Sequence, residues 1–183
     1  MNITERFLKA GRHTRSTNIM PVVSGIVHHW IGNAGTTAEQ NARYFDSIAD
    51  SGPRYASYHY IVDIDGSVLQ LMPNYEVAWH AGPAGKTMPD IATALPAMPN
   101  YCTIGIAHCH KDWDGAPSGK AYQTLLSLDT LLCGIYGIDP ETRVYRHYDI
   151  TGKVCPRYWV NHSNEWSKFI WRLTKAVLHG AAS

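Results

Sequence analysis

The chain has 183 residues, of which 45% are hydrophobic and 17% are charged, and its net charge is +1 when the histidines are neutral. This composition is typical of a globular protein and excludes an intrinsically disordered chain. The basic residues are scattered, which argues against nucleic acid as a partner, and no apolar run is long enough to span a membrane. We expect one domain over residues 1–183 that is a monomer.

The first sixteen residues lack the apolar segment of a secretory signal peptide, so we expect the protein to be cytoplasmic when it is synthesised. The four cysteines show no CxxC spacing, and disulfides are not expected in a reducing compartment. We interpret Cys102, Cys109 and Cys133 as buried thiols and Cys155 as a candidate functional residue. The chain contains ten histidines, six tryptophans and eleven tyrosines. These residue types are common in metal-binding and carbohydrate-binding sites, although aromatic residues are also ordinary core material.

The first half of the chain predicts a strand, a helix and a hairpin. Residues 22–30 are apolar and β-branched until they reach two histidines, which is typical of a buried strand with polar residues at its end. Two overlapping capping boxes in residues 36–40 precede apolar residues at helical spacing, which predicts a helix over 37–50. Residues 58–71 contain two β-rich runs around Asp65-Gly66, the signature of a β-hairpin.

The second half alternates strand and helix signals. The strand candidates are residues 76–80, 101–108 and 144–147. The predicted helices cover residues 118–136 and a segment that begins at about residue 163. The segment from 81 to about 100 has few periodic features, and we expect it to be a loop over the site. The order of elements predicts an α/β fold, a single domain with a mixed sheet flanked by helices and one antiparallel hairpin.

The segment from Arg146 to Pro156 carries the most chemistry, because it places His147, Lys153 and Cys155 close together. A catalytic zinc takes imidazole nitrogen and thiolate sulfur, with three protein ligands and one open position. His147 and Cys155 are two candidate ligands, and His28 at the end of the first strand is the best candidate for the third. Taken separately these residues are weak evidence, since a lone histidine is more often structural than a metal ligand.

Five stretches together make the pattern specific. The sequence resembles the zinc-dependent N-acetylmuramoyl-L-alanine amidases, which include autolysins and peptidoglycan recognition proteins, and it is most similar to phage endolysin catalytic domains. The resemblance extends over about residues 1–170 and rests on Ile26-Val27-His28-His29, Ser57-Tyr58-His59-Tyr60-Ile61-Val62, Ala78-Trp79-His80-Ala81-Gly82, Asn100 through Thr103-Ile104-Gly105-Ile106, and Arg146-His147-Tyr148-Asp149 through Lys153-Val154-Cys155-Pro156.

The resemblance implies one zinc ion per chain, bound by His28, His147 and Cys155, with His29 as a residue of the site wall. A bound zinc lowers the pKa of its water toward about 7, which allows attack on an amide carbonyl at neutral pH. The resemblance also implies catalytic roles for Tyr58 and Lys153. A lysine ammonium stabilises the developing oxyanion, whereas a tyrosine hydroxyl is a poor base and would orient the water or the oxyanion.

The same resemblance gives weaker assignments around the metal. The substrate-binding residues would be His29, Trp79, His80, Asn100 and Trp113. The two tryptophans are also ordinary packing residues, and His80 has an equal claim as the cap of the Gly-rich turn after it. Asp149 is a candidate acceptor for the second N–H of a ligand imidazole. His59, His108 and His110 are interpreted as structural.

The sequence departs from many bacterial relatives at Ala107, where they have a glutamate that can carry a proton. Tyr58 and Lys153 then become the expected helpers. The leading hypothesis is hydrolysis of the amide bond between N-acetylmuramic acid and L-alanine in bacterial peptidoglycan, in a phage or prophage endolysin that reaches the wall at lysis. The alternatives are a non-catalytic peptidoglycan-binding module, a cytosolic wall-recycling amidase and an unrelated zinc hydrolase.

Overall fold

The computed structural model describes residues 1–82 and 87–180. A six-stranded mixed sheet forms the centre, with the strand order β1-β4-β3-β5-β2-β6. All neighbouring strands are parallel except β3 and β4, which form the antiparallel hairpin expected around Asp65-Gly66. The strands are β1 (Ile3–Glu5), β2 (Gly25–Trp30), β3 (Tyr60–Val62), β4 (Val68–Gln70), β5 (Thr103–His108) and β6 (Val144–Arg146).

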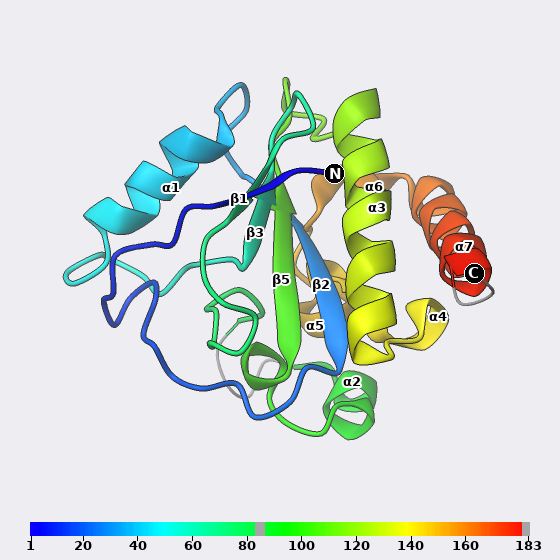
Figure 1. Cartoon of the computed structure of the whole chain (residues 1–183), viewed down its shortest axis with the longest axis horizontal. Coiled ribbons are helices and arrows are strands. Elements are labelled where there is room, and N and C mark those ends of the chain that lie inside the picture. The colour runs from blue at the N-terminus through cyan, green and yellow to red at the C-terminus, as the bar shows by residue number, and fades with distance from the viewer. Residues whose placement is uncertain (83–86, 181–183) are drawn as a thin grey trace.

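Helices cover both faces of this sheet. Figure 1 shows α1 on one side of β5 and β2, and α3 and α7 on the other side. The helices are α1 (Ala38–Ser47), α2 (Pro89–Ala94), α3 (Gly119–Tyr136), α4 (Pro140–Arg143), α5 (His147–Thr151), α6 (Arg157–Asn161) and α7 (Ser163–Gly180), with a short 3₁₀ helix η1 (Pro99–Tyr101) before β5. The expected α/β class and the mixed sheet flanked by helices are confirmed.

Local sequence signals fix the ends of the long helices. Thr37 caps α1, because its hydroxyl accepts a hydrogen bond from the backbone N–H of Gln40, whose side chain in turn accepts from the N–H of Thr37. Ser118 caps α3, because its hydroxyl accepts a hydrogen bond from the backbone N–H of Ala121. Gly137 ends α3 with a φ of 63°, a left-handed conformation that glycine adopts without steric cost.

The two faces of β2 serve different purposes. Ile26 packs into the apolar core beneath α3 and α7, whereas Val27 packs on the opposite face with Ile150 of α5. Successive side chains of a strand point to opposite faces of a sheet. His28 therefore points toward α3 and α7, and His29 points to the face that carries α1 and α5.

Three of the expected elements differ from the structure. Residues 76–80 form no strand, because only Glu76 makes an isolated bridge, to Ile19. The expected loop from 81 to 100 contains α2 and η1, and its residues 83–86 lie outside the described part of the chain. The strand expected from residue 22 begins at Gly25. Short helices such as α5 escaped prediction because a single helical turn has too few residues to show a period.

Within residues 1–82 and 87–180, none of the helices combines the length and the apolar character that crossing a membrane requires. All four cysteines are buried free thiols, which agrees with the interpretation of Cys102, Cys109 and Cys133.

Candidate metal centre

Three buried side chains converge at the carboxyl ends of β2 and β6. His29, His147 and Cys155 each offer one potential ligand atom, and these atoms all lie within 4.8 Å of one another. The Nδ1 atom of His29 is 3.7 Å from Sγ of Cys155, and the imidazole centroids of His29 and His147 are 4.8 Å apart. Two imidazoles and a thiol form the donor set that zinc takes in proteins.

Strand register brings the two histidines together. β2 and β6 are parallel neighbours, and His28 is paired with Arg146. His29 is therefore level with His147, the residue that follows β6 and begins α5. Because neighbouring positions in register share a face of the sheet, His29 and His147 present their imidazoles on the same side.

A backbone hydrogen bond returns Cys155 to this point. After α5, the N–H of Tyr148 donates to the carbonyl of Cys155 at 2.8 Å, so the cysteine lies beside the first turn of the helix. Burial raises the pKa of the Cys155 thiol to about 11, although a backbone hydrogen bond from Trp30 and the charge of Lys153 both lower it. A thiolate at this position consequently requires a further cation, which is the condition that a metal ion satisfies.

The structure does not bring His28, the third expected ligand, to this cluster. Its Nε2 atom lies 2.6 Å from Oδ2 of Asp129 on α3, and both side chains are fully buried on the far face of the sheet. Aromatic rings of Trp159, Trp166 and Phe169 surround the His28 imidazole edge-on. His29, expected as a wall residue, is the histidine of β2 that joins the cluster. The two are adjacent in sequence, and strand alternation separates them.

The two histidines of the cluster are neutral and suited to bind a metal. Burial, followed by the charge of Lys153, lowers the pKa of His147 to about 4. Burial and the neighbouring imidazoles of His147 and His80 hold the pKa of His29 well below its usual value. The Nδ1 atom of His147 is buried and has no hydrogen-bond partner among the described residues. A buried nitrogen that lacks a partner is costly unless a ligand completes it, so the residues present fit a zinc ion.

His147 and Cys155 of this cluster line a cavity of about 730 Å³. Tyr58 and Lys153, the two expected catalytic residues, also line this cavity, and the ring of Tyr58 lies 4.9 Å from that of His29. Burial raises the pKa of the Tyr58 phenol, so it keeps its proton at neutral pH. Among the described lining residues the charged side chains are Arg54 and Lys153, with no carboxylate. Ala107 is fully buried in the apolar cluster on this face.

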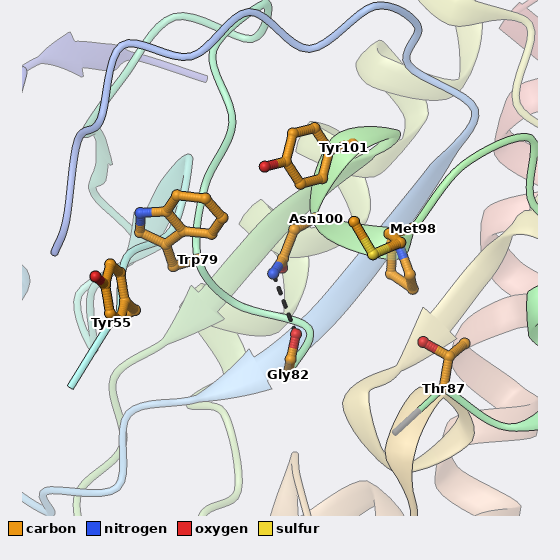
Figure 2. A pocket seen from close by; sticks show the side chains of 8 residues that line it. Tyr55, Trp79, Gly82, Thr87, Met98, Asn100 and Tyr101 are labelled. Carbon is orange, nitrogen blue, oxygen red and sulfur yellow. Dashed lines mark hydrogen bonds between the residues drawn. The ribbon is translucent and has the colours of Figure 1, made fainter. Parts of the chain in front are cut away.

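A second cavity of about 500 Å³ adjoins the first, and both are lined by Tyr55, Trp79 and Gly82. Figure 2 shows Trp79 and Tyr101 on one side of this space, with Asn100 directed at the carbonyl of Gly82. The amide of Asn100 is engaged with the backbone: its Oδ1 accepts from the N–H groups of His80 and Ala81, and its Nδ2 donates to Gly82. Asn100 therefore shapes the 80–82 turn. It also lines the second cavity, and the substrate contact expected for it stays a prediction.

The remaining expected site residues divide into two groups. Trp79 lines both cavities and His80 lines the first, and their contact with substrate stays a prediction. Trp113 is 59% exposed and packs edge-on against Trp30, but it is not among the described lining residues of either cavity. The carboxylate of Asp149 accepts hydrogen bonds from the backbone and guanidinium of Arg146, so it stabilises the start of α5 and is not the acceptor for a ligand imidazole.

Comparison with known proteins agrees with this fold. Residues 19–158 match the model of the family described as N-acetylmuramoyl-L-alanine amidase. A curated relative, the N-acetylmuramoyl-L-alanine amidase BlyA of Bacillus subtilis, is 31% identical over 97% of this chain and 48% of its own length. The solved catalytic domain of XlyA has a TM-score of 0.72 and 27% identity, covering 94% of this chain and 99% of that one. A mutant endolysin from Bacillus subtilis gives the same TM-score and identity, covering 94% and 98%.

The chain therefore belongs to the N-acetylmuramoyl-L-alanine amidase family. It spans about half the length of the curated relatives that it matches.

Proposed function

We propose that this chain is a zinc-dependent amidase that hydrolyses the amide bond between N-acetylmuramic acid and L-alanine in bacterial peptidoglycan. The observation that carries the proposal is the buried cluster of His29, His147 and Cys155, two of which, His147 and Cys155, line a cavity. Family membership and the similarity to an endolysin support the substrate and the reaction.

One zinc ion per chain would be held by His29, His147 and Cys155. When bound, zinc supplies a Lewis acid that activates water for attack on an amide carbonyl near neutral pH. His147 and Cys155 lie in the wall of the cavity and His29 lies beside them, so a peptide bond that enters the cavity comes close to the cluster.

Tyr58 and Lys153 provide the other groups that the reaction needs. Because its pKa is raised, the Tyr58 hydroxyl acts as a hydrogen-bond donor to the water or to the developing oxyanion, and not as a base. The positive charge of Lys153 acts on all three residues of the cluster, lowering the pKa of each. An ammonium at that place stabilises negative charge on the carbonyl oxygen, which is greater in the transition state than in the substrate.

The substrate would extend from the metal cavity into the neighbouring one. Trp79 contributes to both walls, and its indole N–H donates to the carbonyl of Arg12, which holds the ring in place. A fixed aromatic face suits the sugar or the stem peptide on either side of the scissile bond. We propose a role in a phage or prophage endolysin, which acts on the cell wall at lysis.

The test combines metal analysis with identification of the bond that is cut. The purified protein should contain one zinc per chain and clear a suspension of sacculi with release of new N-terminal L-alanine. Cys155→Ala and His147→Ala should lose both zinc and clearing, because a site with two ligands holds metal poorly. Cys133→Ala, which removes a buried thiol on α3, is the matched control and should keep both.

Two results would contradict the proposal. New reducing sugar ends in place of N-terminal L-alanine would make the protein a glycosidase. Full clearing by protein from which a chelator has removed all metal would exclude the zinc mechanism.

A further inference from the structure

A chain of contacts links His29 to the backbone of β5 through a second buried histidine. Nε2 of His29 lies 3.1 Å from Nδ1 of His80, and Nε2 of His80 lies 3.2 Å from the carbonyl oxygen of Thr103. All three residues are buried. The other nitrogen of His29, Nδ1, is the atom that faces Cys155.

The ends of this chain determine where its protons are. A carbonyl oxygen only accepts hydrogen bonds, so Nε2 of His80 must carry the proton that it donates to Thr103. The Thr103 hydroxyl does not offer the opposite arrangement, because it donates its own proton to the carbonyl of Pro99 at 2.6 Å. A neutral imidazole has one N–H, so Nδ1 of His80 is left as an acceptor.

The acceptor on His80 then determines the tautomer of His29. Nε2 of His29 donates to Nδ1 of His80, and Nδ1 of His29 keeps its lone pair. That lone pair faces Cys155, on the side where the metal would bind.

We propose that His80 is a positioning residue that fixes the tautomer and the orientation of His29, so that His29 is ready to bind zinc through Nδ1. The inference rests on the metal centre proposed above. Neither the sequence pattern nor the family match assigns this role, and it differs from the substrate-wall role expected for His80. Hydrogen-bonded partners of this kind commonly change metal affinity by 10- to 100-fold.

A hydrogen bond to the backbone of His80 and close packing against its ring restrict the position of the His80 side chain. The backbone N–H of His80 donates to Asn100, whose amide also binds the two residues that follow, as Figure 2 shows for Gly82. Below the ring lies Gly105 of β5, where an added Cβ would be 2.6 Å from Cγ of His80. Only glycine at this position leaves space for the imidazole, so the ring packs directly against the backbone of β5.

Two substitutions of similar size separate the hydrogen bond from the packing. His80→Leu fills the space but removes the acceptor, and we expect zinc affinity to fall by about 10- to 100-fold, measured by competition with a chromogenic chelator. His80→Asn keeps an amide oxygen near the place of Nδ1 and should recover most of the affinity. Thermal unfolding of the metal-free proteins shows whether each variant is folded when its affinity is measured.

A second measurement reads the tautomer directly in the absence of metal. Long-range ¹H–¹⁵N spectra of metal-free wild-type protein should show His29 with its proton on Nε2. In His80→Leu the same ring should lose this preference and show both tautomers, a change that a purely structural role for His80 would not produce.

The results distinguish the two proposals. If wild-type protein binds no zinc, the metal centre is wrong, and the spectra still decide the tautomer. If wild-type protein binds zinc and folded His80→Leu binds it equally tightly, the positioning role is wrong and the metal centre stands. A proton on Nδ1 of His29 in the metal-free wild type would also overturn the positioning role.

Discussion

His28 and His29 are consecutive residues that lie on opposite faces of the sheet. His28 pairs with Asp129 at 2.6 Å beneath α3, whereas His29 lies beside His147 and Cys155. The first contact joins β2 to the helical layer, and the second belongs to the candidate site. The two histidines therefore have separable consequences when they are replaced.

Replacing His28 by leucine should lower stability and leave the metal centre intact. The change leaves the carboxylate of Asp129 buried without its partner, which costs about 3–5 kcal/mol in comparable pairs. Urea unfolding of metal-free protein measures this loss, and the double variant His28→Leu with Asp129→Leu should recover part of it. His29→Leu should instead abolish zinc binding with a smaller effect on folding. Loss of zinc from folded His28→Leu protein would contradict the separation of roles.

Metal-free protein should become less stable as the pH falls from 6.5 toward 4. Burial lowers the pKa of His59 and His108 to about 4 from an ordinary value of 6.5. Between these values the unfolded chain binds more protons than the folded one, so the stabilisation is complete above pH 6.5 and declines below it. Each residue contributes up to about 1.4 kcal/mol per pH unit. Urea unfolding at pH 7 and pH 5 measures the difference, and His59→Gln should reduce it.

Tyr58→Phe and Lys153→Ala should lower kcat while zinc content stays at the wild-type level. Both groups line the cavity without belonging to the three-residue cluster. Removing one donor to an oxyanion commonly costs about 100- to 1000-fold in kcat. Release of N-terminal L-alanine at saturating substrate gives kcat, and zinc analysis of the same samples is the control. A rise in KM with kcat unchanged would show that these residues bind the substrate and do not assist the reaction.

Trp79→Ala should weaken substrate binding, and Trp113→Ala should not. Trp79 lines both cavities, whereas Trp113 is an exposed residue that packs against Trp30. Loss of an aromatic contact worth about 1 kcal/mol corresponds to a rise in KM of roughly fivefold. Initial rates on soluble muramyl peptides give the two KM values. Equal values for the two variants would exclude a substrate-binding role for the Trp79 ring.

The long elements could be predicted because their signals are local. The helix that became α3 has a serine cap, apolar residues at three- and four-residue steps and a glycine stop, and the hairpin of β3 and β4 has an Asp-Gly turn. These features lie within a few residues of one another and depend little on the rest of the chain. The convergence of His147 and Cys155 was also predictable, since they are close in sequence.

The sequence by itself determined the fold class, the family resemblance and two of the three residues of the candidate centre. Tertiary structure decided the third, because the choice between His28 and His29 depends on which face of β2 carries α3 and which carries α5. A shift of one residue moves a side chain to the other face, and both faces of this strand are buried. With no polar face to mark the exterior, the residue pattern of the strand holds no information about which histidine meets His147.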